Sequence, residues 1–322
     1  MPVNIQTFFS IPVRCIDNVI QFISNDTGLD ANQQQTKDIF SDKWTSTNEI
    51  QDVEKLFKTQ REWFLKLYGF DTVENFQAYL QNKFLIVDTG CGLGYKAAWF
   101  AELAPHATVI GIDISEAAHI AAKNYAHLPN LWFLQADIAL TGLKPGCTEL
   151  MVCDQVIMHT EHPEQTFRHL SECTSAAGEF LCYFYRKKAL PRELIDDYFR
   201  KRTHEVSPEE MWKFSEQITE LGKRLSELNT SFDCPEITLL GIPGGKYDIQ
   251  RFIYWNFLKC FWKEDWGFEL SKITNYDWYA PSNAQRFSKD EVLLLAQNNK
   301  MQASYFHEEE ACYSGRFAFT HP

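Results

Sequence analysis

The residues that point most directly to chemistry form the run Asp88-Thr89-Gly90-Cys91-Gly92-Leu93-Gly94, which separates an apolar segment from a helical one. Glycines let a backbone turn tightly and approach a ligand closely. The spacing is G-x-G-x-G, whereas loops that hold a pyrophosphate at a helix N-terminus read G-x-G-x-x-G. A glycine turn with a capping Asp would explain this run equally well, so other residues must indicate what it binds.

Three acids stand at the ends of three successive apolar segments. Asp88 lies two residues before the first glycine, where a carboxylate repels pyrophosphate and suits a ligand with positive charge. Asp113 lies 23 residues after Gly90, where a carboxylate can accept from both ribose hydroxyls. Asp137 is placed to accept from an adenine amino group. Each acid alone is more often a cap or a surface residue, but together they predict a site for a cationic nucleoside.

The elements that must position these acids alternate along the chain. Residues 84–88, 108–113, 131–137, 149–156 and 179–185 have the length and composition of strands, and residues 94–104, 115–127 and 163–176 those of helices. This alternation predicts βαβ units and a parallel sheet that is buried on both faces. Open sheets of this kind bind ligands at the carboxyl ends of their strands.

The flanking regions read differently. Residues 1–80 have helical spacing, and 190–229 predict long amphipathic helices with a cap, a Pro and two acids at Ser207-Pro208-Glu209-Glu210. Residues 241–245 predict a turn, 288–298 a helix, and 301–308 and 312–320 two strands. We therefore expect four segments: an N-terminal helical cap (1–80), a core (81–188), a helical, aromatic-rich insertion (189–285), and the last helix and closing strands of the core (286–322).

Residues 84–185 resemble the class I S-adenosylmethionine-dependent methyltransferases of small molecules, a group that includes quinone-biosynthesis enzymes. VDTGCGLG (87–94) matches their first motif, VIGIDIS (109–115) their ribose-binding strand, and LQADI (134–138) their adenine-binding strand end. The resemblance implies an α/β, Rossmann-like sheet of seven strands, the last antiparallel, with N-terminal helices and a large helical insertion before the last strands. It also implies S-adenosyl-L-methionine as cofactor and S-adenosyl-L-homocysteine as product.

The resemblance extends to residues 153–160, which match the fourth-strand segment beside the reacting methyl group, and more weakly to Lys43-Trp44 and to 277–281. His159 matches a common loop position at the methyl-transfer face, and His159 and Tyr185 are the candidate catalytic residues. The residues expected to bind the cofactor are Asp88, Gly90, Cys91, Gly92, Gly94, Asp113, Ile114, Ala136, Asp137, Ile138, Asp154, Gln155, Met158 and Trp44.

The segment His159-Thr160-Glu161-His162 also suggests a metal site. Metal ligands on one helix face usually stand at i and i+4, as in H-E-x-x-H, and this segment before Pro163 lacks that spacing. We therefore expect no metal. His162 departs from the acid that is often found at its position in the family. For His159, a solvent-facing loop histidine is an equal alternative to a base at the cofactor.

Two features after the fifth predicted strand concern the acceptor. Residues 186–202 carry seven basic side chains against three acids, which fits recognition of an anion but is more typical of a solvated helix face. The aromatic residues of 247–279 suit an acceptor pocket, and they suit the insertion's own core equally well. The residues expected to contact the acceptor are Arg186, Tyr247, Trp278 and Tyr279.

Composition limits the partners and the location. A net charge of −12 argues against general nucleic-acid binding. Nine cysteines without C-x-x-C pairs indicate a reducing compartment, and the start lacks the basic flank and apolar block of a signal peptide, so we expect a cytoplasmic protein. No apolar run is long enough to span a membrane. A homodimer is left open.

The function expected on these grounds is in-line methyl transfer to an O, N or C atom of a small or lipid-like acceptor, the reaction class EC 2.1.1. The insertion is expected to cover the acceptor as a lid, and the N-terminal helices to close the other side. A catalytically silent subunit or sensor with this fold is the main alternative, because fold does not determine function. A nicotinamide-dependent oxidoreductase is the second alternative function.

Overall fold

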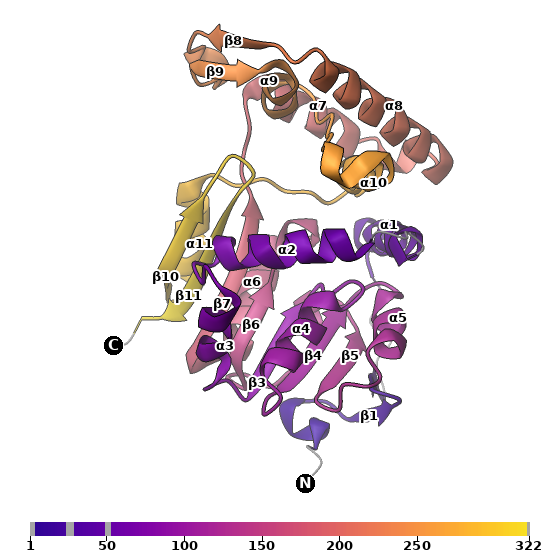
Figure 1. Ribbon diagram of the computed structural model, residues 1–322. Coiled ribbons are helices and arrows are strands. Elements are labelled where there is room, and N and C mark those ends of the chain that lie inside the picture. The colour runs from indigo at the N-terminus through magenta and orange to yellow at the C-terminus, as the bar shows by residue number, and fades with distance from the viewer. Residues whose placement is uncertain (1–3, 24–28, 49–52, 321–322) are drawn as a thin grey trace. The chain divides into compact units, whose positions relative to one another are not determined.

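The computed structural model describes residues 4–23, 29–48 and 53–320. The chain forms two compact units (Figure 1): one comprises Met1–Gln33, Phe57–Tyr185 and Gln285–Pro322, and the other Gln34–Leu56 and Arg186–Ala284. Parts of the region predicted to be helical, 24–28 and 49–52, lie outside the described residues. Within the described ranges, no helix combines the length and the apolar character needed to cross a membrane.

The first unit is built on a nine-stranded sheet of order β1-β2-β5-β4-β3-β6-β7-β11-β10. Neighbours from β2 to β7 run parallel, whereas β11 is antiparallel to both β7 and β10. The strands are β1 (Val13–Ile16), β2 (Val19–Phe22), β3 (Leu85–Thr89), β4 (Thr108–Asp113), β5 (Leu131–Gln135), β6 (Thr148–Cys153), β7 (Thr174–Tyr185), β10 (Met301–Glu308) and β11 (Cys312–Phe319).

Burial explains why the central strands read as continuous apolar runs. Every residue of β3 and β4 is buried, as the middle of a sheet covered on both faces requires. The sheet is contacted by α4 (Tyr95–Leu103), α5 (Ala117–Asn124), α6 (Pro163–Cys173) and α11 (Lys289–Asn298). The helices α2 (Val53–Leu67) and α3 (Val73–Leu80) bring Phe64 and Phe76 against Trp99 of α4. The predicted α/β sheet with an antiparallel last strand is therefore confirmed.

The sheet is larger than the predicted seven strands. Residues 13–22, for which helical spacing was predicted, form the hairpin β1–β2, and β2 extends the sheet by pairing with β5 in parallel. Its two-residue turn consists of Asp17 and Asn18, with φ of +48° and +61°. Such turns match the twist of paired strands, and Asp and Asn tolerate positive φ better than most residues do. The short 3₁₀ helices of this unit are η1 (Ile5–Phe8), η2 (Ile138–Leu140) and η3 (Ile157–His159).

The second unit is mainly helical. Its longest helix, α8, begins with the predicted cap, where the Ser207 hydroxyl accepts from the Glu210 N–H and the Glu210 carboxylate accepts from the Ser207 N–H. A small hairpin, β8–β9, was not predicted. The elements of this unit are α1 (Ala31–Asn48, mostly), α7 (Leu190–Arg200), η4 (Thr203–Glu205), α8 (Pro208–Glu227), β8 (Ser231–Cys234), η5 (Thr238–Leu240), β9 (Gly245–Asp248), α9 (Ile249–Asn256), η6 (Glu264–Trp266) and α10 (Gly267–Tyr279).

Candidate functional site

The predicted site residues of the first unit gather at one edge of its sheet. Five neighbouring strands, in the order β5-β4-β3-β6-β7, run parallel, so their carboxyl ends meet at the same edge (Figure 1). At these ends, or within two residues of them, stand, in that order, Asp137, Asp113, Asp88, Asp154 and Tyr185. The topology thus places side by side the side chains that the sequence separates by almost a hundred residues.

The glycine loop joins β3 to α4 in a conformation that requires glycine. Gly90 has φ of +74°, and a Cβ there would lie 2.2 Å from the Cγ2 atom of Val156. Gly94 has φ of +79°, and a Cβ there would lie 2.7 Å from the ring of Phe133. The N–H groups of Gly90 and Cys91 both donate to the carbonyl of Ile112, at 2.6 and 3.0 Å. The loop is therefore held against the end of β4.

Asp113 ties the same loop to the end of its own strand. One carboxylate oxygen accepts from the Gly92 N–H at 2.7 Å, and the other accepts from the N–H and hydroxyl of Ser115 at 2.9 and 2.6 Å. The side chain is buried. Asp113 is consequently fixed in orientation before any ligand binds.

Asp88 is the most unusual acid at this edge. It is 1% exposed, and its Oδ2 atom has no hydrogen-bond partner among the described residues. Burial raises the pKa of this carboxyl to about 7; Lys96 opposes the rise, and Asp154 and Asp113 add to it. A buried carboxylate without a cation is costly, so a cationic ligand group beside it would be strongly favoured.

The third acid, Asp137, lies half-buried after β5. Its Oδ1 atom accepts from the Ala139 N–H at 2.9 Å and caps the short helix η2, which contains Ile138. Burial raises the pKa of Asp137. The neighbouring Ala136 N–H donates to the carbonyl of Asp113, so the ends of β4 and β5 are joined where Ile114 and Ala136 stand.

Asp154 belongs to a buried polar cluster that the sequence did not reveal. Its Oδ2 atom lies 2.5 Å from the ammonium of Lys96, with both side chains almost fully buried. Its Oδ1 atom accepts from the Tyr68 hydroxyl at 3.0 Å. The amide of Gln155 donates to Asp154 and to Gln60. Lys96 is the second residue of the helix that follows the glycine loop, and a lysine buried there needs an anionic partner. This position was the signal that the sequence offered.

Lys96 connects this cluster to Asp88. Burial by itself lowers the pKa of Lys96, but Asp154 and Asp88 outweigh burial, so the pKa is raised overall. Lys96 therefore stays charged at neutral pH. Its positive charge supports both carboxylates, although it makes its ion pair with Asp154.

The two candidate catalytic residues contact each other. The Nε2 atom of His159 lies 3.3 Å from the Tyr185 hydroxyl, and the two rings meet edge to face at 5.5 Å. His159 is 4% exposed, whereas Tyr185 is half-buried. Met158, beside His159 in η3, is fully buried. His159 is thus no solvent-facing loop histidine.

Trp44, Arg186, Tyr247, Trp278 and Tyr279 belong to the second unit, and their roles remain predictions. Inside that unit, the Trp278 indole donates to Asp196 at 2.8 Å and the Tyr279 hydroxyl donates to the carbonyl of Lys259 at 3.1 Å. Both side chains are buried. These two aromatic residues therefore form part of the core of their own unit.

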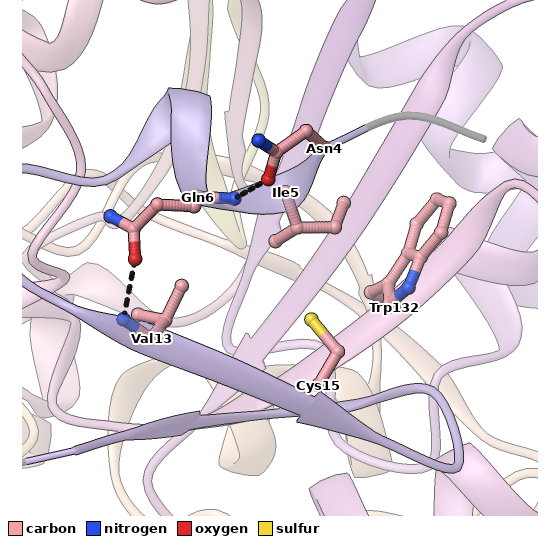
Figure 2. Close-up of a pocket in the computed structure, with 6 residues that line it drawn as sticks. All are labelled: Asn4, Ile5, Gln6, Val13, Cys15 and Trp132. Atoms are coloured by element: carbon pink, nitrogen blue, oxygen red, sulfur yellow. Dashed lines mark hydrogen bonds between the residues drawn. The ribbon is translucent and has the colours of Figure 1, made fainter. Parts of the chain in front are cut away.

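A pocket of about 290 Å³ lies elsewhere in the first unit, beside the N-terminal hairpin (Figure 2). Figure 2 shows Gln6 accepting from the Val13 N–H, with Cys15 and Trp132 on the other side. None of its lining residues was predicted to bind cofactor, and burial raises the pKa of the Cys15 thiol, which leaves it less reactive. We assign no role in the strand-end site to this pocket.

Comparison with known proteins agrees with this geometry. A family model described as a methyltransferase domain matches residues 80–236. The trans-aconitate 2-methyltransferase of Deinococcus radiodurans is 49% identical over 53 residues, which are 16% of this chain and 20% of that protein. The malonyl-[acyl-carrier protein] O-methyltransferase of Halalkalibacterium halodurans is 29% identical over 100 residues, which are 30% of this chain and 37% of that protein. The chain thus matches less than half the length of either relative.

Among solved structures, the magnesium protoporphyrin IX methyltransferase of Synechocystis with bound S-adenosylhomocysteine has a TM-score of 0.47 and 13% identity. The likeness covers 89% of this chain and all of that one. These values are too low to support an inference about this chain.

A methyltransferase-domain model matches residues 80–236, and the sheet of the first unit has the parallel core and the antiparallel last strand that the sequence predicted. The cofactor of this domain is S-adenosyl-L-methionine. The residues present fit it: the buried, unpartnered Oδ2 of Asp88 suits the ammonium of the methionyl part, and the glycine at position 90 lets the Val156 side chain pack directly against the loop.

The pKa of Asp88 makes cofactor binding depend on pH. The ammonium of the cofactor pairs with the deprotonated carboxylate, and below pH 7 the ligand-free protein holds Asp88 protonated. We therefore expect affinity for S-adenosylhomocysteine to fall about tenfold per pH unit between pH 7 and 5. Calorimetry across this range tests the expectation, with Asp88→Asn as the variant that should show a much flatter profile. Equal slopes in the two proteins would exclude Asp88 as the titrating group.

Proposed function

We propose that the protein is an S-adenosylmethionine-dependent methyltransferase of a small-molecule acceptor, methylating an O, N or C atom. The observation that carries this proposal is the buried Asp88 carboxylate with an unpartnered oxygen beside the glycine loop. The name of one curated relative, a trans-aconitate 2-methyltransferase, supports an acceptor of metabolite size, and the name of the other gives a malonyl group carried on a protein.

When bound, the cofactor supplies an electrophilic methyl group on its sulfonium. The chain's own task is then to orient both reactants and to exclude water. Asp88 holds the ammonium, Asp113 the ribose and Asp137 the adenine. The Lys96–Asp154 pair keeps the end of β6 rigid beside them.

We propose that His159 and Tyr185 handle the acceptor's proton. Tyr185 is the more exposed of the two, and its hydroxyl lies 3.3 Å from the His159 Nε2 atom. The acceptor would therefore contact the Tyr185 hydroxyl, and the proton would reach His159 through it. General bases of this kind contribute about 10²- to 10⁴-fold to rate.

The experiment is to incubate the full-length protein with S-adenosylmethionine and a panel of metabolites, and to measure release of S-adenosylhomocysteine. With an active acceptor, His159→Asn should lower kcat by about a hundredfold and leave cofactor affinity unchanged. His162→Asn is the matched control, because His162 lies in the same loop and makes no side-chain cap bond to α6. Equal rates in both variants would remove His159 from the mechanism. Tight cofactor binding without product across a broad panel would favour the silent sensor.

A further inference from the structure

Lys259 is a buried cation of the second unit that no part of the proposed chemistry uses. It lies between α9 and η6 and is 7% exposed. Its Nζ atom lies 4.4 Å from the centroid of the Trp278 ring. Within the described ranges, this ammonium has neither a hydrogen-bond acceptor nor a carboxylate within ion-pair distance. Buried lysines are rare unless they are paired, so this side chain calls for an anion.

The nearby anion Asp196 is already engaged. Its Oδ2 atom accepts from the Arg192 Nε at 2.9 Å, and its Oδ1 atom accepts from the Trp278 indole at 2.8 Å. Arg192 is 1% exposed, lies over the Tyr254 and Trp278 rings, and also donates to the Tyr254 carbonyl. The opposite charges of Arg192 and Asp196 thus cancel each other, and Asp196 does not compensate the charge of Lys259.

The remaining charges that influence Lys259 do not balance it. Asp277 lies 2.7 Å from the Lys43 ammonium, and Arg200 donates to the carbonyls of Pro281 and Trp278. The charged side chains named so far are thus four basic groups, on Lys259, Arg192, Arg200 and Lys43, and two carboxylates, on Asp196 and Asp277. The rest of the protein is acidic, with a net charge of −12. Of these groups Lys259, Arg192 and Asp196 are buried, so the buried part has one more basic than acidic side chain, and an anion would compensate that excess.

We propose that Lys259, lying against the Trp278 indole, binds a carboxylate of a small organic acid. Lys259 offers a single positive charge, and Arg192 has its guanidinium committed to Asp196 and Tyr254. One compact ammonium matches one singly charged carboxylate, whereas a phosphate dianion is usually held by several donors.

The protonation of Lys259 gives this site a distinctive signature. Burial lowers the pKa of Lys259 to about 7; Asp277 and Asp196 oppose the decrease, and Arg192 and Arg200 add to it. At pH 8 the ligand-free lysine is therefore mostly neutral. A bound carboxylate stabilises the charged form, so binding at pH 8 takes up a proton.

The experiment is calorimetric titration of the full-length protein at pH 8 with benzoate, in two buffers of different ionisation enthalpy. Benzamide serves as the neutral probe of the same shape, and inorganic phosphate as the second anion. We expect benzoate to bind with proton uptake and to bind more tightly than either control. Lys259→Met keeps the apolar stem and should weaken benzoate binding by about tenfold or more.

Lys263→Met is the matched control, because Lys263 also lies over an indole, that of Trp266, at 5.0 Å, but is more exposed. S-adenosylhomocysteine affinity, measured on every variant, reports separately on folding and on the cofactor site. No benzoate binding by protein that binds the cofactor would overturn the carboxylate site and leave the proposed function standing. The carboxylate site would also be overturned if the Lys259→Met variant bound benzoate as tightly as the unchanged protein. Tighter binding of phosphate than of benzoate, or benzoate binding without proton uptake, would overturn it as well.

Discussion

Replacing Asp88 with Asn is expected to weaken S-adenosylhomocysteine binding by about a hundredfold or more. The variant removes the buried charge that faces the ligand's ammonium, and losing one partner of a desolvated ion pair costs about 2–5 kcal/mol of binding. The ligand-free protein should be no less stable at pH 8, because its own fold gives Asp88 Oδ2 no partner. Calorimetry and denaturant unfolding measure the two effects.

The sign of the stability effect follows from the pKa. Folding raises the pKa of Asp88 to about 7, so the folded protein binds more protons than the unfolded chain between about pH 4 and 7. The free energy of unfolding of the ligand-free protein therefore decreases as pH rises across this window. In the Asp88→Asn variant this decrease should be absent. Asp71→Asn is the control, since Asp71 is exposed and its φ of +62° suits Asn. Normal cofactor affinity in Asp88→Asn would refute the assignment of Asp88.

Replacing Lys96 with Met is expected to lower the free energy of unfolding by about 3–5 kcal/mol, because it leaves Asp154 buried without its cation. This loss is a large part of the stability of a typical domain. Lys96 also holds down the pKa of Asp88, so cofactor affinity at pH 7 should fall as well.

Two further variants separate the ion pair from other effects of the substitution. Lys58→Met removes an exposed pair with Glu62 at 4.0 Å and should change stability by less than about 1 kcal/mol. The double variant Lys96→Met/Asp154→Asn should recover part of the loss, since no buried charge remains at that position. A Lys96→Met protein as stable as Lys58→Met would show that the buried pair has no special role.

The strand-end acids were predictable because each depends on local sequence. An apolar run that ends in Asp88 or Asp113 indicates both the strand and the edge where it ends, and β4 spans the predicted residues 108–113. The hairpin β1–β2 was missed although Asp17-Asn18 between two β-forming runs is a turn signal. The helical spacing read for residues 1–80 as a whole obscured it.

Contacts between distant residues were not predictable. Lys96 and Asp154 are 58 positions apart, and only the β3–β6 pairing brings α4 next to the end of β6. The basic run 186–202 was judged more typical of a solvated face. Lys201 and Arg202 are indeed exposed, but Arg192 turns inward to Asp196, four residues along α7. That spacing was visible in the sequence, whereas the burial of the pair was not.

The most direct test of the central claim is calorimetric titration of the full-length protein with S-adenosylhomocysteine, S-adenosylmethionine and the nicotinamide dinucleotides in turn. The Asp88, Asp113 and Asp137 edge predicts one equivalent of each sulfur nucleoside bound and no dinucleotide binding, because the Asp88 carboxylate repels a pyrophosphate. Binding of NAD or NADP without binding of either sulfur nucleoside would contradict the account.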